Sequence, residues 1–309
     1  MSAVPVPAER ILVIKLGALG DFVLALGPMA AIRRHHPTAR ITLLTTRAYA
    51  GFAAASPYFD AVRIDERPSL ANLRGVLRLR RWLIGERFDR VYDLQTSDRS
   101  GFYYRLMGPG ARPEWSGIAR GCSHPHANPN RDFQHTIERQ REQLAMAGIA
   151  DVPAPDLGWA DADLAPLALT EPFVLLVPGG AAHRPAKRWP VAHYAALAAD
   201  LAQRGVLPAV IGGEQEAPLA RAIPGVRDLT GRTDFLTLAA LARRAAWVVG
   251  NDTGPVHLLA AAGAPTSVLF SAASDPARTA PVGRAVTILR RASLADLTVA
   301  EVAATIALG

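Results

Sequence analysis

Apolar and polar residues alternate in blocks along this chain. Short, continuous apolar runs are separated by longer segments whose apolar positions have helical spacing. Such runs predict buried strands of a parallel sheet, and the longer segments predict helices that cover its faces, so we expect an α/β fold. The predicted strands are residues 11–16, 40–45, 61–65, 90–94, 173–177, 206–211, 226–229, 247–249, 266–270 and 285–289. The predicted helices are residues 22–35, 49–55, 70–85, 100–107, 133–147, 191–204, 236–243, 256–262 and 297–307.

A proline-rich stretch over 151–172 interrupts this pattern. Because 309 residues suit two domains, we predict an N-terminal domain over 1–150, a linker over 151–172 and a C-terminal domain over 173–309. The pattern also fails over 108–132, where Gly, Pro, His and Asn dominate, and this composition predicts a long loop.

Three histidines in or beside that loop, His124, His126 and His135, raise the question of a metal. No carboxylate or second histidine stands near them at a ligand spacing such as His-Glu-x-x-His. We therefore expect solvated side chains and no metal site. The single cysteine, Cys122, cannot form an intramolecular disulfide, which fits a reducing compartment.

Composition and charge narrow the class of protein. The chain is 50% hydrophobic and 20% charged, which indicates a globular protein with a full core. It starts without the basic and then apolar order of a signal peptide, so we expect a cytoplasmic protein. A net charge of +7 implies an acidic partner. Dispersed arginines without interleaved aromatic residues favour an anionic substrate or a membrane surface over nucleic acid, although a genome that favours arginine would give the same composition.

Candidate chemistry in the N-terminal half follows two predicted strands. After the first strand, Gly17 and Gly20 allow close approach of the backbone to a ligand, and Asp21 can project from the carboxyl edge of the sheet. Gln95 and Arg99 follow the strand at 90–94 and can line the same edge. The alternatives are that Asp21 caps a helix and that the second polar stretch caps the helix after it.

In the C-terminal half, the strand at 173–177 is followed by Gly179 and then by Lys187 and Arg188, close to a helix start that Pro190 marks. Open backbone and basic side chains at a helix start suit a diphosphate, whereas solvated side chains are the alternative. Glu214 follows the next strand, where an acidic group can hold ribose hydroxyls or, alternatively, favour a helix N-terminus.

A third polar turn, Gly250-Asn251-Asp252-Thr253-Gly254-Pro255, stands between a buried strand and a helix. Free N–H groups at such a helix start attract anions, and Asp252, Thr253 and His257 add polar side chains there. We interpret this turn as half of a phosphate and sugar pocket. The alternative is an ordinary helix cap with His257 packed on the sheet.

Together these segments resemble glycosyltransferase family 9, the ADP-heptose:lipopolysaccharide heptosyltransferases. The resemblance extends over nearly the whole chain, and two segments depart from it, the turn at 271–276 and the loop at 120–131. The matching segments are 11–21 with Pro28 and Arg33 to Pro37, Asp93-Leu94-Gln95, Pro178-Gly179 with Lys187-Arg188-Trp189-Pro190, and Gly250 to Pro255 with His257.

The resemblance implies a GT-B architecture, in which two Rossmann-like domains face one another across a cleft. It assigns the acceptor to the N-terminal domain and the nucleotide sugar to the C-terminal domain, and it allows the last helix to pack back on the N-terminal domain. The implied reaction is an inverting, metal-independent transfer of heptose from ADP-heptose to a lipopolysaccharide core or related glycan, with no cofactor. Alternatives are another nucleotide sugar or acceptor, or a non-catalytic nucleotide-sugar-binding protein.

By resemblance, Asp21 is the general base and Lys187 steadies the leaving diphosphate. The implied donor-binding residues are Gly179, Lys187, Arg188, Glu214, Asp252, Thr253, Gly254 and His257. The implied acceptor-side residues are Gly17, Gly20, Gln95 and Arg99. An anionic, lipid-linked saccharide as the acceptor would bring the protein to the cytoplasmic face of the inner membrane as a peripheral protein.

Overall fold

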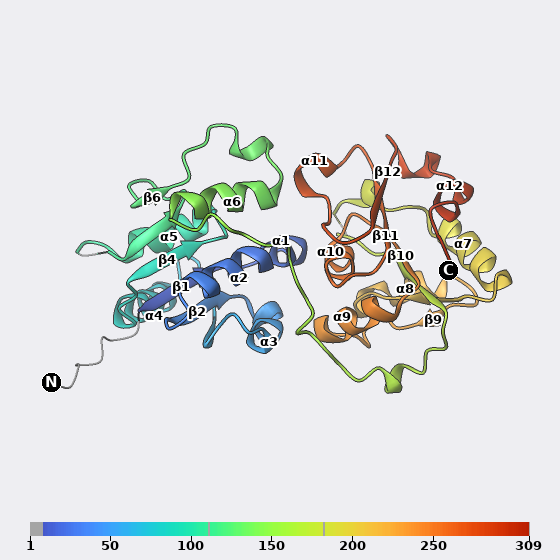
Figure 1. Ribbon diagram of the computed structural model, residues 1–309, viewed down its shortest axis with the longest axis horizontal. Helices are drawn as coiled ribbons and strands as arrows, with labels where there is room; N and C mark the ends of the chain where they lie inside the picture. The colour runs from blue at the N-terminus through green and yellow to red at the C-terminus, as the bar shows by residue number, and fades with distance from the viewer. Residues whose placement is uncertain (1–8, 111, 182, 309) are drawn as a thin grey trace. The chain divides into compact units, whose positions relative to one another are not determined.

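The computed structural model describes residues 9–110, 112–181 and 183–308, and the chain divides into two compact units (Figure 1). Unit 1 contains the chain up to Ala18 together with Ala25–Ala154, and unit 2 contains Leu19–Leu24 and Pro155–Gly309. The boundary after Ala154 lies inside the predicted linker. No helix in the described part of the chain has both the length and the apolarity needed to span a bilayer.

Unit 1 is built on a fully parallel sheet with the strand order β3-β2-β1-β4-β5-β6. Its strands are β1 (Arg10–Ile14), β2 (Arg40–Thr45), β3 (Ala61–Ile64), β4 (Arg90–Asp93), β5 (Glu114–Gly117) and β6 (His124–Pro125). In the centre, Val13 pairs with Leu43 on one side and Tyr92 on the other. This order is that of a doubly wound fold whose direction reverses between β1 and β4, the position where such sheets bind ligands.

Helices cover both faces of this sheet (Figure 1). They are α2 (Leu26–His35), α3 (Arg47–Ala55), α4 (Leu73–Gly85), α5 (Asp98–Leu106) and α6 (Thr136–Met146), with a 3-10 turn η1 (Arg131–Phe133) before α6. Leu12 and Ile14 of β1 pack in one hydrophobic core with Leu83 of α4, Tyr103 of α5 and Trp115 of β5. Burial of these large side chains holds the two central strands, and thus their carboxyl ends, in fixed register.

The predicted helix over 22–35 is divided. The chain forms α1 (Leu19–Leu24) and then α2, with the break at Ala25. Pro28 explains this break because it has no N–H for the carbonyl of Leu24 and its ring would clash with that carbonyl. The predicted turn was also too long, since Leu19 to Asp21 already belong to α1.

The stretch at 108–132 is not the irregular loop that its composition predicts. It contributes β5 and the edge strand β6, and Trp115 in β5 is fully buried. The expectation of solvated histidines is wrong for His126, which is 4% exposed and lies 3.1 Å from the Glu142 carboxylate. Tertiary packing orders this segment despite its glycines and prolines, because its few large side chains enter the core.

Unit 2 repeats the topology of unit 1, with the parallel order β12-β11-β10-β7-β8-β9. Its strands are β7 (Phe173–Val177), β8 (Leu207–Val210), β9 (Arg227–Asp228), β10 (Trp247–Asn251), β11 (Thr266–Phe270) and β12 (Val286–Arg290). Its helices are α7 (Val191–Gln203), α8 (Ala217–Arg221), α9 (Phe235–Arg244), α10 (Gly254–Ala261), α11 (Pro276–Thr279) and α12 (Val299–Ala303). Its 3-10 turns are η2 (Ala165–Leu167), η3 (Pro185–Lys187), η4 (Glu214–Glu216) and η5 (Leu294–Asp296).

The last helix packs within unit 2. Val302 and Ile306 are buried in the same core as Trp189 and Tyr194, and the Trp189 indole donates a 2.8 Å hydrogen bond to the Leu297 carbonyl. Within unit 2, the buried side chains of this last segment are therefore covered by the core that contains α7.

Candidate active site

The central strands of unit 2, β7 and β10, are neighbours, and the sheet order reverses between them. Each strand is followed at its carboxyl end by one of the polar loops that the sequence singles out. The loop after β7 contains Gly179 and Lys187, and the turn after β10 contains Asp252 and starts α10. Because parallel strands end at the same edge, the sheet brings these two loops together.

Lys187 and Asp252 form the central ion pair of this edge. The Lys187 Nζ lies 2.5 Å from Asp252 Oδ2, and the side chains are 15% and 7% exposed. Burial acts to raise the pKa of Asp252, but the adjacent His257 imidazole and Lys187 ammonium outweigh it and lower the pKa to about 2. Asp252 is therefore ionised at neutral pH and holds the lysine in place.

His257 stands on the other side of the same carboxylate. It lies in the first turns of α10, is 5% exposed and has its Nε2 3.8 Å from Asp252 Oδ1. Its Nδ1 is buried, with no hydrogen-bond partner in the described part of the chain. The structure thus gathers Lys187 from the loop after β7, Asp252 from the turn after β10 and His257 from α10, and it leaves one imidazole nitrogen without a hydrogen bond among the described residues.

The helix α1 lies against α10 within unit 2. A Cβ on Gly20 would stand 2.9 Å from the His257 ring, and a Cβ on Gly254 would stand 2.6 Å from the Leu19 side chain. These two glycines allow the helices to approach closely. Asp21, the third residue of α1, is half-buried.

Asn251, which the sequence analysis did not single out, ties the loops together. Its side chain is fully buried, and its Oδ1 accepts hydrogen bonds from the Trp189 N–H at 2.9 Å and the Tyr194 hydroxyl at 3.2 Å. Its Nδ2 donates to the carbonyls of Pro178 at 2.9 Å and Gly179 at 3.1 Å. The last residue of β10 therefore fixes both ends of the loop that carries Lys187.

Two more polar groups at this edge are buried without a partner among the described residues, Thr253 Oγ1 and Arg188 Nε. Both side chains lie beside Gly180: a Cβ there would stand 3.2 Å from Thr253 Cγ2 and 3.8 Å from Arg188 Nε. Arg188 also donates to the Gly180 carbonyl at 2.5 Å. Unpaired buried donors beside a helix N-terminus are suited to an anionic ligand, which would satisfy them.

The acidic residues after β8 have different environments. Glu214 starts the short turn η4, is exposed and lies against Gly231. Glu216, which the sequence analysis passed over, accepts a 2.7 Å hydrogen bond from the Gly213 N–H. A Cβ on Gly179 would stand 2.7 Å from Glu216 Cγ. Glu216 is therefore the carboxylate packed against the glycine loop, and Glu214 points to a neighbouring part of the same edge.

In unit 1, two of the predicted acceptor-side residues meet at the carboxyl ends of β1 and β4. Gln95 Oε1 accepts a 2.8 Å hydrogen bond from the Leu16 N–H, next to Gly17. Gly17 has φ +132°, which favours glycine, and a Cβ there would stand 3.0 Å from the Tyr49 ring. Arg99 lies on α5, where its guanidinium is 3.4 Å from the Tyr103 hydroxyl.

The same edge of unit 1 contains a buried carboxyl group and a buried lysine. Asp93 is fully buried at the end of β4, and its Oδ1 accepts hydrogen bonds from the N–H groups of Gln95 at 3.1 Å and Thr96 at 2.9 Å. Burial raises the pKa of Asp93 to about 6, although these backbone bonds oppose the shift. Its Oδ2 is unpaired among the described residues. Lys15 is also buried and donates to the Leu94 carbonyl at 3.1 Å.

The described residues contain no group of three or more His, Cys, Asp and Glu side chains placed to hold a metal ion. The Asp161-Ala162-Asp163 stretch has the Asp-x-Asp pattern of metal-dependent sugar transfer, but its Asp163 lines a cavity with Phe173, the first residue of β7, and not the carboxyl ends of the strands. Its Asp161 pairs with Arg243 at 2.9 Å.

Comparison with known proteins decides the class of this site. The family model of glycosyltransferase family 9 (heptosyltransferase) matches residues 76–302. The chain belongs to this family. The prediction of a glycosyltransferase is therefore confirmed, and the two repeated α/β units place this family member in the GT-B fold class, as expected.

Individual relatives extend over most of the chain. Lipooligosaccharide heptosyltransferase 2 of Haemophilus ducreyi is 26% identical over 316 residues, which cover 91% of this chain and 88% of the relative. The structure of Escherichia coli ADP-heptose lps heptosyltransferase II has a TM-score of 0.79 at 22% identity and covers 96% of this chain and 97% of that one. E. coli heptosyltransferase WaaC with ADP has a TM-score of 0.73 at 21% identity and covers 95% and 98%.

Proposed function

We propose that this family 9 glycosyltransferase transfers heptose from ADP-heptose to a lipopolysaccharide core or a related glycan, with inversion and without a metal. The observation that carries the proposal is the Lys187–Asp252 pair, which stands at the carboxyl edge of β7 and β10 beside unpaired groups of Thr253 and Arg188. Relatives named as heptosyltransferases match over the same chain length and support heptose as the sugar.

The donor binds to unit 2. An ammonium has three donors, so Lys187 keeps two for phosphate oxygens while Asp252 holds the third. Arg188, the Thr253 hydroxyl and the start of α10, at Gly254, supply further donors to the diphosphate. Gly179 provides open backbone in the same loop. The charge that develops on the leaving ADP is thereby stabilised by groups that are already in place.

The sugar and ribose contacts involve the remaining side chains. Asp252 Oδ1 accepts a hydrogen bond from a heptose hydroxyl, and the unpaired His257 Nδ1 forms a hydrogen bond with another. Glu214 contacts the ribose hydroxyls from the turn after β8. Asn251 acts by holding the two loops in position through its hydrogen bonds to Trp189 and Pro178.

The acceptor binds to the carboxyl edge of β1 and β4 in unit 1, at Gly17, Gln95 and Arg99, with Gly20 in the segment that follows. Asp21 is the general base. In an inverting displacement the acceptor oxygen forms the new bond to the anomeric carbon while the bond from that carbon to the diphosphate breaks. The acceptor proton passes to the Asp21 carboxylate, and the electron pair leaves with ADP.

The acceptor is a lipid-linked, anionic saccharide. A net charge of +7 suits such a substrate and the anionic surface that carries it. The protein therefore acts in the cytoplasm, as a peripheral protein at the inner membrane, and it needs neither nucleic acid nor a further cofactor.

Calorimetric titration with ADP, UDP and GDP, each in the presence of EDTA, tests the donor assignment. We expect ADP to bind in preference to the other two, with affinity unchanged by EDTA. Preference for UDP or GDP would replace the sugar donor, and a requirement for a divalent metal would overturn metal independence. Transfer from ADP-heptose to heptose-deficient lipopolysaccharide then tests catalysis, and ADP binding without transfer would indicate a non-catalytic binding protein.

A further inference from the structure

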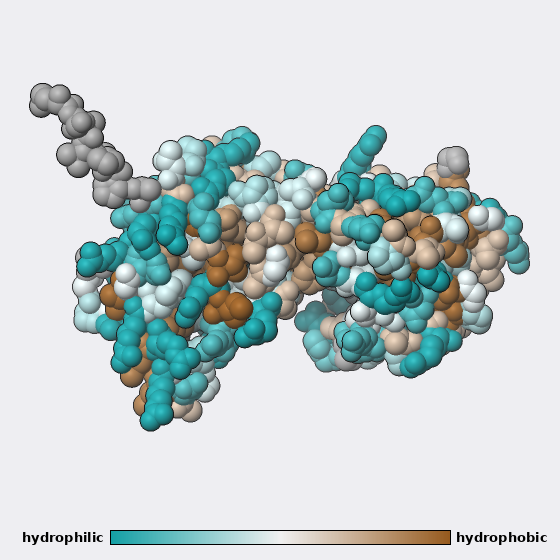
Figure 2. Space-filling view, turned by 90° about the horizontal axis from the view of Figure 1, so that it is seen from below, coloured by the Kyte–Doolittle hydropathy of each residue, from teal (hydrophilic) through white to brown (hydrophobic). Residues whose placement is uncertain are grey.

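Exposed aliphatic residues concentrate at one helix of unit 1. Four of the eight large hydrophobic residues that are exposed in the described part of the chain lie within or just before α4. They are Leu70, Leu73, Leu77 and Ile84, with exposed fractions of 71%, 68%, 49% and 41%. In Figure 2, brown hydrophobic patches lie between teal hydrophilic side chains on unit 1. Isolated exposed leucines are common in proteins, but such a cluster marks an interaction surface.

Helix geometry places these residues on one line. At 100° per residue, Leu73, Leu77 and Ile84 fall within a narrow stripe along the 13 residues of α4. Leu83 lies about 100° around the helix from Ile84 and is fully buried in the core of unit 1. The helix therefore has two apolar faces, one used by the fold and one left to solvent.

Arginines border the exposed stripe. Arg74 and Arg81 lie next to it on one flank, and both are exposed with no ion-pair partner in the described part of the chain. Arg78, farther around the same flank, is 3.5 Å from Glu66, and both of those side chains are 66% exposed. The positive charge of Arg74 and Arg81 is therefore available to an external anion.

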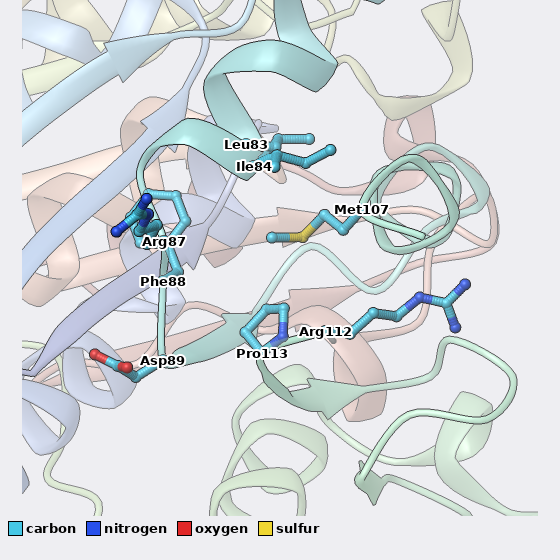
Figure 3. A pocket seen from close by; sticks show the side chains of 8 residues that line it. All are labelled: Leu83, Ile84, Arg87, Phe88, Asp89, Met107, Arg112 and Pro113. Carbon is cyan, nitrogen blue, oxygen red and sulfur yellow. The ribbon is translucent and has the colours of Figure 1, made fainter. Parts of the chain in front are cut away.

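A pocket continues this surface at the end of α4 (Figure 3). It has a volume of about 380 Å³ and is lined by Leu83, Ile84, Arg87, Phe88, Asp89, Met107, Arg112 and Pro113. Ile84 belongs to both the stripe and the pocket. Figure 3 shows the Met107 side chain extending between the α4 residues and Pro113, so the pocket has apolar walls with Arg87 and Arg112 at its sides.

We propose that the α4 surface, composed of Leu70, Leu73, Leu77, Ile84, Arg74 and Arg81, docks on an anionic phospholipid bilayer. An aliphatic stripe flanked by arginines along about 20 Å of helix matches the interface of such a bilayer, where apolar side chains enter the acyl boundary and guanidinium groups bind phosphates. A second copy of this chain would bring the same arginines together, and their repulsion disfavours that occupant. The inference rests on the proposed function in one respect: a lipid-linked acceptor is the reason why the protein would bind a membrane.

Vesicle co-sedimentation of the full chain tests this proposal. We expect binding to vesicles of phosphatidylethanolamine with phosphatidylglycerol and weak binding to phosphatidylcholine vesicles. Leu73→Ser with Leu77→Ser, and separately Arg74→Gln with Arg81→Gln, should each weaken partitioning about tenfold. Matched controls remove the same groups elsewhere, Met146→Ser with Ile288→Ser and Arg221→Gln with Arg284→Gln, and should partition as the parent does.

ADP titration of each variant separates this proposal from the proposed function. Unchanged ADP affinity with lost vesicle binding supports the α4 surface and shows that the variants are folded. If the parent does not bind anionic vesicles, or if both α4 variants bind them as tightly as the parent does, the proposal is wrong whatever the ADP result. Light scattering that shows self-association of the parent, lost in the leucine variant, would assign the surface to a second copy instead. Vesicle binding by a parent that binds no ADP would contradict only the proposed function.

Discussion

The Asn251 side-chain oxygen accepts a hydrogen bond from the Trp189 N–H at 2.9 Å, across 62 positions of sequence. This bond connects the end of β10 to the loop that carries Lys187. Asp252, the neighbour of Asn251, therefore meets Lys187 at 2.5 Å because the backbone on both sides is already fixed. Preorganisation of this kind means that a ligand does not have to order the loops when it binds.

Asn251→Ala should lower the free energy of unfolding by roughly 2–4 kcal/mol, because the Trp189 N–H and two carbonyls lose their buried partner. Urea unfolding followed by tryptophan fluorescence measures this change. Asn130→Ala, at an exposed asparagine, is the control and should be nearly neutral. A loss below about 0.5 kcal/mol would show that water replaces the amide without cost.

Lys187→Met should weaken ADP binding by about tenfold or more, because a charge-assisted contact to the diphosphate is lost. Lys187→Arg should retain part of the affinity, since the charge remains but the single point of contact with Asp252 changes. Calorimetric titration with ADP measures both variants. Arg221→Met is the control for loss of an exposed positive charge, and equal affinities in Lys187→Met and this control would remove Lys187 from the phosphate site.

Asp21→Ala should leave ADP binding nearly unchanged while heptose transfer falls by roughly two or more orders of magnitude, as expected for loss of a general base. Asp21 lies in the first turn of α1. Asp98→Ala, in the first turn of α5, controls for removal of a carboxylate from a helix start. Transfer that persists in Asp21→Ala would assign the proton to another group.

The ionised Asp252 carboxylate should stabilise the fold, and this contribution to the free energy of unfolding should be lost in acid. Its folded pKa of about 2 lies below the ordinary value of 3.8, so the stabilisation is complete above pH 4 and is lost as the pH falls to about 2. The expected size is on the order of 2 kcal/mol. Comparison of parent and Asp252→Asn by urea unfolding across this window tests it, and a difference that does not vary with pH would contradict it.

Asp93 should change the free energy of unfolding with the opposite pH dependence. Its folded pKa of about 6 lies above the ordinary value of 3.8, so the buried carboxyl destabilises the fold increasingly as the pH rises from about 4 to 6. Asp93→Asn removes this dependence while its amide oxygen can still accept the Gln95 and Thr96 bonds. We expect the variant to gain roughly 2–3 kcal/mol relative to the parent between pH 4 and pH 7. Parallel stability curves over that range would show that Asp93 is not the titrating group.

The order of short buried strands and longer helices was available from the sequence, because a strand covered on both faces must be apolar throughout and a covering helix must be apolar on one side. The glycine turn before α10 and the basic residues before α7 could also be found in the sequence. In each segment, the residues that carry the chemistry are close together along the chain. Pro28 is the local signal for the break between α1 and α2, because it lacks an N–H within an otherwise apolar, helical run.

Only the tertiary structure decided which of these groups meet. Lys187 and Asp252 are 65 residues apart, and their contact depends on the pairing of β7 with β10, which no local pattern specifies. The same holds for Asn251, for Glu216 against Gly179, and for β5, whose Trp115 is buried by packing that outweighs the weak propensity around it. Sequence periodicity reports which face of an element is covered, whereas the identity of the covering residue is set by strand order and burial across the whole chain.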